Sequence, residues 1–306
     1  MHRLRRRCYD TGMSPDVQLS RLSFLAAAAA LSGGTLLPTP AYAQAQFQIQ
    51  GNVSVNDYIS RVVELLKAFE TGDRRPLSFI NPAKYIQHNL RLGDGVKALA
   101  DRIQAIPKGS AKVNTLRAFR DGNYVFTHSE YDFGEPMIGF DIFRFENGLI
   151  VEHWDNLQKI ATKPSHSMVD GPRTASDADK TDANKALLKS YMDEIFVQKR
   201  RDKFASYFDG NNYIQHNPLI LEDGLTGLLA GLQALAKQGL TVEYDGVHMI
   251  LGEGDFVLVV NEGKFGGKPT AIYDLYRVAN NKIAEHWDTL ETIPPRDAWK
   301  NANGKF

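Results

Sequence analysis

Two short motifs, each present twice, contain most of the side chains that could move a proton. The sequence YIQHN occurs twice, EHWD occurs twice, and an Asp-x-x-Arg motif precedes each EHWD; the positions are 85–89 and 213–217, 152–155 and 285–288, and 141–144 and 274–277. Histidine exchanges protons near neutral pH, and a carboxylate in apolar surroundings has a raised pKa and can act as a base. These residue types together predict proton abstraction next to a carbonyl group.

The candidates for this chemistry are one histidine and two carboxylates in each copy. They are His88, Asp141 and Glu152, and His216, Asp274 and Glu285. Aromatic side chains of the same motifs are candidates for binding a substrate: Tyr85, Trp154, Tyr213, Tyr276 and Trp287. The alternative is that the acidic and histidine side chains only hydrogen-bond the YIQHN loop to a sheet and catalyse nothing.

Strand alternation predicts which of these side chains share a face. A two-residue turn at 147–148 would direct one set into a cup: Asp141, Glu152 and Trp154, with Asp274, Tyr276, Glu285 and Trp287 in the second copy. The other face would hold a set suited to an interface between the copies: Arg144, His153 and Asp155, with Arg277, His286 and Asp288. One bulge in the last two strands would exchange the two faces, because an extra residue inverts the alternation.

Neither a metal nor an organic cofactor is expected. His88, His153 and Glu152 could form a ligand cluster, but adjacent residues of a strand point apart, so the two strand residues would not face one ion. The sequence has no phosphate-binding glycine loop and no Gly-x-Ser-x-Gly nucleophile motif.

The order of elements around the motifs is also repeated, with an offset that drifts only from 128 to 133 residues. In each copy, apolar residues at helical spacing come first and strand-like runs follow, which predicts an α+β fold. We expect an export signal at residues 1–43, a first domain at 52–162, a linker at 163–181, a second domain at 182–295 and a C-terminal tail at 296–306.

The first 43 residues have the pattern of a cleaved export signal. Five arginines precede an apolar run that ends in Ala41-Tyr42-Ala43. Removal of this segment takes away five basic and two acidic residues. The remaining chain has 31 basic and 34 acidic residues, a formal charge of −3. We therefore expect a periplasmic or secreted protein that binds neither nucleic acid nor, after cleavage, a membrane.

Each copy contains YIQHN, a following helix, Asp-x-x-Arg and a final EHWD strand. This combination resembles the SnoaL-like polyketide cyclases of the nuclear transport factor 2-like superfamily. The resemblance covers residues 56–160 and 182–293. It implies cone-shaped domains, each with helices packed into a curved antiparallel sheet around a pocket, and a tendency to dimerise. Here an internal pseudo-dimer or a homodimer would satisfy that tendency.

Cyclases of that family promote an intramolecular aldol condensation without a cofactor. The resemblance carries this role to His88, Asp141 and 152–155, and to His216, Asp274 and 285–288. The second copy, with Pro218 after YIQHN and Tyr276 in its cup, is closer to the family pattern than the first, which has Leu90 and Phe143.

Two functions are therefore expected as rivals. One is an acid–base enzyme, a cyclase or isomerase acting on a small or medium carbonyl compound. The other is a non-catalytic exported module whose two cups bind an apolar ligand or a partner. An epoxide hydrolase resembles the chain less, because it needs arginine beside its aspartates and alternation separates Arg144 from Asp141.

Overall fold

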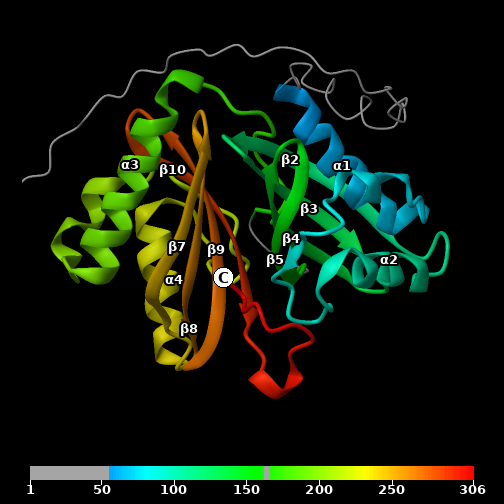
Figure 1. Cartoon of the computed structure of the whole chain (residues 1–306). Coiled ribbons are helices and arrows are strands. Elements are labelled where there is room, and N and C mark those ends of the chain that lie inside the picture. Colours follow the sequence, from blue (N-terminus) through cyan, green and yellow to red (C-terminus); the bar gives the residue numbers. More distant parts are fainter. Residues whose placement is uncertain (1–54, 162–165) are drawn as a thin grey trace, which may run out of the picture. The chain divides into compact units, whose positions relative to one another are not determined.

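The computed structural model describes residues 55–161 and 166–306, and it contains the same arrangement of elements twice (Figure 1). The first arrangement, copy one, has a five-stranded sheet in the order β1-β5-β4-β3-β2. Its elements are α1 (Val55–Thr71), η1 (Arg75–Phe79), β1 (Ile86–Gln87), α2 (Gly95–Ala105), β2 (Lys112–Asp121), β3 (Tyr124–Asp132), β4 (Pro136–Glu146) and β5 (Leu149–Lys159). The short strand β1 is parallel to β5, and the other pairs are antiparallel.

Copy two repeats this sheet in the order β6-β10-β9-β8-β7. Its elements are η2 (Ala178–Lys180), α3 (Thr181–Tyr191), the π-helix η3 (Met192–Val197), η4 (Arg201–Tyr207), β6 (Ile214–Gln215), α4 (Gly224–Lys237), β7 (Val242–Glu253), β8 (Phe256–Phe265), β9 (Lys268–Ala279) and β10 (Lys282–Thr292); η5 (Arg296–Ala298) follows. Helices followed by a mostly antiparallel sheet, twice, confirm the α+β fold class predicted from the sequence.

Each sheet has one face covered by the helices of its own copy. In copy one, Val62, Leu65 and Leu66 of α1 are buried against strand residues such as Val125 and Phe143. In copy two, Leu188 of α3 and Leu228 of α4 belong to the corresponding core. Burial of an apolar stripe at helical spacing is what holds such helices to a sheet. We call the helix-covered face of each sheet the inner face and the opposite one the outer face.

The hairpins that carry EHWD have the expected turns but not the expected register. Asn147 and Gly148 have φ of 50° and 80°, as a two-residue type I′ turn requires, and Asn280 and Asn281 have φ of 53° and 58°. The pairing then shifts: Phe145 faces Ile150, but Arg144 faces Glu152, so Val151 is an extra residue. In copy two the shift lies between Ile283 and Glu285.

These bulges make the predicted assignment of faces wrong for β5 and β10, whereas the assignment for β4 and β9 agrees with the structure. Below each bulge, Asp141 is opposite Asp155 and Asp274 is opposite Asp288, so each pair of aspartates shares the inner face. Glu152 and Glu285 consequently lie on the outer face with Arg144 and Arg277. The physical reason is that two residues of one strand oppose one residue of its partner, which inverts the alternation beyond that point.

A third core joins the outer faces of the two sheets. It contains Phe126 and Trp154 from copy one with Phe256, Tyr273 and Trp287 from copy two. Asn156 is also buried there, and its Nδ2 donates to the backbone oxygens of Ala271 at 3.1 Å and Thr289 at 2.8 Å. The two copies therefore stabilise each other through apolar burial and buried hydrogen bonds.

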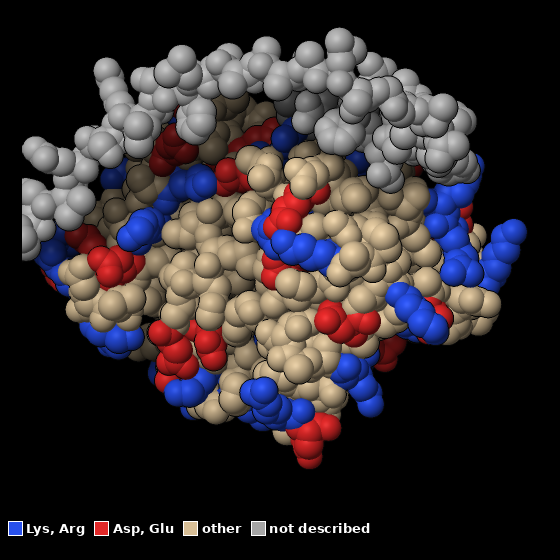
Figure 2. All heavy atoms as spheres, in the orientation of Figure 1, with Lys and Arg blue, Asp and Glu red and all other residues tan. Residues whose placement is uncertain are grey.

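The described residues bear on two further expectations, a membrane span and the distribution of surface charge. The expected export signal, residues 1–43, lies outside the described residues. Among the described residues, no helix is long and apolar enough to cross a membrane. On the face shown in Figure 2, basic and acidic side chains are interspersed rather than gathered by sign.

Candidate functional site

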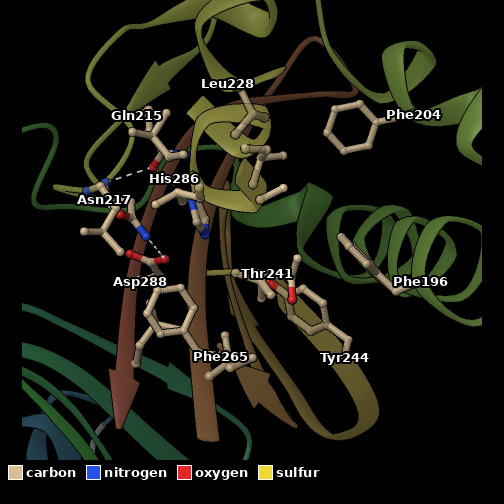
Figure 3. Close-up of a pocket in the computed structure, with 18 of the residues that line it drawn as sticks. Phe196, Phe204, Gln215, Asn217, Leu228, Thr241, Tyr244, Phe265, His286 and Asp288 are labelled. Carbon is tan, nitrogen blue, oxygen red and sulfur yellow. Dashed lines mark hydrogen bonds between the residues drawn. The ribbon is translucent and has the colours of Figure 1, made fainter. Parts of the chain in front are cut away.

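The inner face of copy two opens into a cavity of about 430 Å³. Its walls are largely apolar and aromatic, and one group of polar side chains lies on β10 and at the end of β6 (Figure 3). Arg201, Gln233 and Thr241 also line the cavity. The apolar and aromatic walls include Phe196, Phe204, Leu228, Tyr244, Phe265 and Tyr276. We call Gln215, Asn217, His286 and Asp288 the polar group. A concave apolar site with a few convergent polar groups is the usual form of a small-molecule site.

Asp274 is the anchor of the polar group. It is 0% exposed, and its carboxylate accepts hydrogen bonds from Asn261 Nδ2 at 2.8 Å and Tyr244 Oη at 3.3 Å. His286 Nε2 lies 2.9 Å from its Oδ1. Because these partners satisfy both carboxylate oxygens, Asp274 holds the ring of His286 in place rather than reaching a ligand.

The protonation of His286 follows from Gln215. The backbone N–H of Asn217 donates to Gln215 Oε1 at 2.9 Å, so the amide oxygen of Gln215 is the atom that faces His286 Nδ1 at 3.0 Å. Nδ1 must therefore carry a hydrogen, and Nε2 shares a further proton with Asp274. Burial opposes the charged ring, but the bond to Asp274 and the charges of Asp274 and Asp288 outweigh it and raise the pKa of His286.

Asp288 differs from Asp274 in having one free oxygen. Its Oδ2 accepts a hydrogen bond from Asn217 Nδ2, whereas its Oδ1 has no partner among the described residues. The side chain is 7% exposed and lines the cavity. Burial raises its pKa to about 6, against the opposing effect of His286. A buried carboxylate with a free oxygen and a pKa near neutrality has the properties of a general base.

Tyr276 supplies a neutral hydrogen-bond donor on the same face. It is paired with His286 across β9 and β10, its ring stacks on the imidazole at 4.7 Å, and it lines the cavity. No hydrogen bond joins its hydroxyl to another described residue. Burial raises its pKa well above the ordinary value, with the charge of Asp274 adding to the effect. The hydroxyl therefore stays protonated and can donate to a ligand oxygen.

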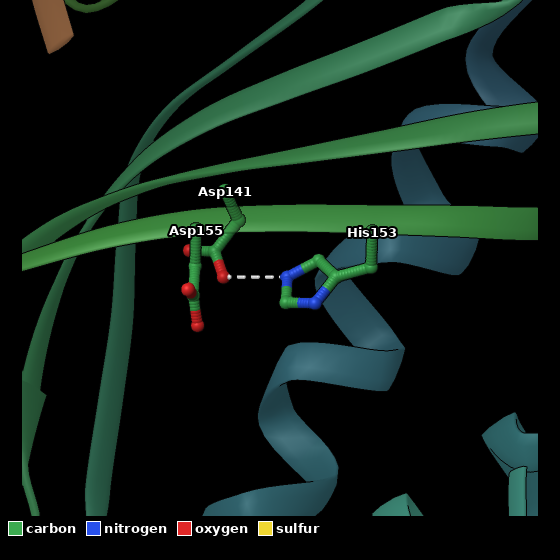
Figure 4. Close-up of side chains that lie close together, drawn as sticks. All are labelled: Asp141, His153 and Asp155. Carbon is green, nitrogen blue, oxygen red and sulfur yellow. Dashed lines mark hydrogen bonds and ion pairs between the residues drawn. The ribbon is translucent and has the colours of Figure 1, made fainter. Parts of the chain in front are cut away.

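Copy one has the same histidine and aspartates in a different setting (Figure 4). His153 Nε2 lies 3.1 Å from Asp141 Oδ1, and its Nδ1 lies 2.9 Å from Gln87 Oε1. Phe143 stands where copy two has Tyr276, so the neutral donor is missing. Asp155, the counterpart of Asp288, has Lys305 Nζ 3.6 Å from its Oδ1.

The other predicted site residues lie on the outer face. His216 Nε2 is 2.9 Å from Glu285 Oε1, and Arg277 Nε donates to Glu285 Oε2 at 2.7 Å. Burial raises the pKa of Glu285, but the bonds from His216 and Arg277 outweigh it, and the net shift is downward. Copy one repeats the group with His88, Glu152 and Arg144. Trp287 and Trp154 stack on the two histidines and belong to the outer core.

The structure thus exchanges the predicted faces of the EHWD residues alone: Asp141, Asp274 and Tyr276 stay on the inner faces as predicted, and Arg144 and Arg277 stay on the outer faces. His153, Asp155, His286 and Asp288, expected at the interface, are on the inner faces, and His88, Glu152, His216 and Glu285 are not. Of the two tyrosines of YIQHN, Tyr213 lines the copy-two cavity and Tyr85 belongs to the copy-one core. Of the predicted sites, Asp274 and Tyr276 share the inner face of copy two.

Sequence reasoning missed the amides that orient the site. Gln215 and Asn217 are two residues apart in YIQHN, and both side chains point to the inner face of the sheet, toward His286 and Asp288 respectively. The signal was present in the motif, because residues i and i+2 of an extended segment share a face. Tyr244 had no such signal, since it reaches Asp274 from a strand 30 residues away.

A divalent cation could use the same inner cluster. Asp274, His286 and Asp288 each offer a ligand atom, and these atoms lie within 4.8 Å of one another, as do those of Asp141, His153 and Asp155. An ion in copy two would have to replace the hydrogen bond between His286 and Asp274. In copy one it would also meet the ammonium group of Lys305.

The sequence matches no protein-family model, and no curated protein matches it. Solved structures do show similarity. A proposed ketosteroid isomerase from Kribbella flavida DSM 17836 is 18% identical, covering 38% of this chain and 84% of that chain, with a TM-score of 0.30. The proposed polyketide cyclase IdmH from Streptomyces antibioticus is 21% identical, covering 32% of this chain and 89% of that chain, with a TM-score of 0.27.

A further similar structure is an NTF-2 like protein of unknown function from Burkholderia xenovorans LB400. It is 17% identical, covering 34% of this chain and 85% of that chain, with a TM-score of 0.30. At these values the similarity says nothing of what this chain binds or transforms. The fold class stated above comes from the elements and strand order of the chain itself.

Proposed function

We propose that copy two is a cofactor-independent acid–base enzyme of the SnoaL-like cyclase or isomerase kind, acting on a carbonyl compound. The observation that carries this proposal is Asp288, which lines an apolar cavity and has a pKa of about 6, and whose buried Oδ1 has no hydrogen-bond partner among the described residues. At pH 7 such a group is ionised by about ten to one, and it is a stronger base than an ordinary aspartate.

The proposed step is proton transfer from the α-carbon of the substrate to Asp288. The C–H bond breaks, Oδ1 takes the proton, and the electron pair moves into an enolate whose charge lies on the carbonyl oxygen. Tyr276 donates a hydrogen bond to that oxygen, and such a donor in a water-poor site stabilises developing charge. Return of the proton to another carbon gives isomerisation, and attack of the enolate on a second carbonyl gives aldol closure.

The remaining polar residues position the base. Asn217 holds Oδ2 of Asp288, so that Oδ1 is the oxygen left for the substrate. His286 and Asp274 share a proton beside it, and a positive ring there limits how far burial raises the pKa of Asp288. The apolar walls fit a small or medium apolar carbonyl compound. We propose that the mature protein works after export, on the pattern of residues 1–43.

The experiment that tests this function is exchange of α-protons for deuterium in a panel of ketones and β-keto esters, followed by proton NMR. Wild-type protein should catalyse exchange of at least one compound, Asp288→Asn should lose it, and Asp155→Asn should keep it. Saturable binding of a panel compound without exchange would favour the rival function, a ligand-binding module. Equal exchange by wild type and Asp288→Asn would refute the role of this base.

A further inference from the structure

Arg201 is the one lysine or arginine among the described residues that line the copy-two cavity. It begins η4, and Phe204, three residues further along, also lines the cavity. Side chains three residues apart lie one above the other in a 3₁₀ helix, so both reach the cavity from the same face of η4. Figure 3 shows Phe204 on the side of the cavity opposite Asn217 and Asp288. The cavity therefore has a carboxylate on one side and a cation on the other.

The guanidinium group of Arg201 has no counter-ion among the described residues, and no hydrogen bond joins it to any of them. The acid that pairs with its neighbours is already engaged. Lys203 Nζ lies 2.8 Å and Arg200 Nη1 lies 3.9 Å from Glu194 Oε1, and Tyr207 Oη donates to Glu194 Oε2 at 3.0 Å. Arg201 thus keeps its five N–H donors for a ligand.

The rim of the cavity is apolar and open to solvent. Leu219 and Leu232 line the cavity and are exposed, as Arg201 is. A ligand can therefore bury an apolar body against the walls while a charged group stays at the surface, which avoids the cost of burying a charge. A molecule with one apolar part and one negative group fits both features.

Copy one has an acid at the equivalent position. Counting back from the two YIQHN motifs, Asp73 occupies the place of Arg201. Ile80 and Phe208, each seven residues further along, make equivalent bridges to β5 and β10, so the alignment holds through this segment. Arg75 Nη2 lies 2.6 Å from Asp73 Oδ2, so the charge at this position is already neutralised. The free cation therefore belongs to the copy in which we place the proposed base.

We infer that copy two takes an amphiphilic keto acid, whose carboxylate binds Arg201 while its apolar body fills the cavity and its ketone lies at Asp288 and Tyr276. One arginine balances one negative charge, and its planar fork matches a carboxylate. A phosphate monoester carries about −1.5 to −2 charges at pH 7, more than a single cation balances.

The direction in which the acid binds follows from charge. A carboxylate next to Asp288 would repel it, whereas Arg201 attracts the same group on the other side of the cavity. The position of the ketone rests on the proposed function. Binding of the carboxylate at Arg201 does not require turnover.

Calorimetric titrations without turnover test this inference. The probes are straight-chain acids from hexanoate to dodecanoate, each compared near neutral pH with its primary amide, which is neutral and of similar size. Wild type should bind the best acid about fivefold more tightly than its amide, because an exposed ion pair contributes up to about this factor. The preference should shrink as the salt concentration rises.

Arg201→Gln should weaken binding of that acid by about fivefold and change binding of the amide by less than about twofold. Arg200→Gln is the matched control. It removes the same charge from the neighbouring residue, which pairs with Glu194 and does not line the cavity, so it should keep the wild-type preference. The circular dichroism spectrum checks that both variants are folded.

An unchanged preference for the acid in folded Arg201→Gln would overturn the inference, as would an equal loss in Arg200→Gln. Absence of saturable binding by every acid of the series would overturn it as well. Failure of the proposed function gives a different result. If no ketone or keto acid exchanges its α-protons but wild type prefers the acid and Arg201→Gln does not, the proposed base fails and the carboxylate site stands.

Discussion

Asp288 and Asp155 occupy equivalent places in the two sheets, each opposite an aspartate that is bonded to histidine, but only Asp155 has a lysine ammonium beside it. Both accept a hydrogen bond from the asparagine of YIQHN. The two carboxylates thus have the same scaffold and different electrostatic surroundings. Because a neighbouring ammonium lowers the basicity of a carboxylate, we place the proposed base in copy two.

Asp288→Asn should remove turnover without unfolding the protein. Asparagine keeps an oxygen that can accept the bond from Asn217 but cannot take a proton, and loss of a general base costs about 10²- to 10⁴-fold in rate. The rate of α-proton exchange and the circular dichroism spectrum check this result. Asp155→Asn is the matched control and should exchange at the wild-type rate. Similar losses in both variants would contradict the assignment to copy two.

The acid limb of the pH–rate profile should report Asp288. In wild type, kcat/KM should fall below about pH 6, as the carboxylate takes up its proton. The hydrogen bond from Asn217 lowers the pKa of Asp288, so Asn217→Ala should move this limb to higher pH. Asn89→Ala in copy one should leave it in place. A limb that stays fixed in Asn217→Ala would mean that another group limits the rate.

Much of the fold could be predicted from the sequence, whereas the faces of the site could not. The repeated motifs and the Asn147-Gly148 turn indicate two α+β copies and their final hairpins. The extra residue at Val151 leaves no mark in an apolar strand, yet it decides whether His153 or Glu152 faces the cup. Strand propensity describes residues that fit a pleated surface, and both registers satisfy it. The hydrogen bond from Lys305 Nζ to the backbone oxygen of Asp155 joins residues 150 positions apart, which no local pattern can indicate.

His216 and Glu285 should matter for stability rather than for chemistry. His216→Ala removes the donor from one oxygen of the buried Glu285 carboxylate, while Arg277 keeps the other. A buried acceptor left without a partner costs about 1 to 3 kcal/mol. His216→Ala should therefore lower Tm by roughly 2 °C or more, since about 2 °C per kcal/mol is a lower figure for domains of 150–250 residues. His88→Ala should lower Tm by a similar amount through the equivalent pair in copy one. Lost exchange at an unchanged Tm would place His216 in the active site instead.

The same pair gives a pH dependence of stability with a fixed sign. The net pKa of Glu285 is lowered in the folded protein, so the carboxylate contributes stability above its unfolded pKa, about 4.3. That contribution is lost as the pH falls below this value. Glu285→Gln should therefore lower Tm at pH 7 and change it less at pH 3, and equal changes at both pH values would contradict the linkage.

The contribution of Asp288 to the pH dependence of stability should have the opposite sign, because its pKa rises on folding from 3.8 to about 6. Between these values the folded protein binds more protons than the unfolded chain, so stability falls as the pH rises through this window and stays low above it. A shift of about two units corresponds to about 2 to 3 kcal/mol. Asp288→Asn removes this destabilising charge and should therefore raise Tm at pH 8 by roughly 4 °C or more. At pH 4 the variant and wild type should unfold at nearly the same temperature. Asp155→Asn, which takes a carboxylate away from Lys305, should give no such gain at pH 8. A variant at position 288 that is less stable than wild type at pH 8 would show that its carboxylate has a partner in the folded protein.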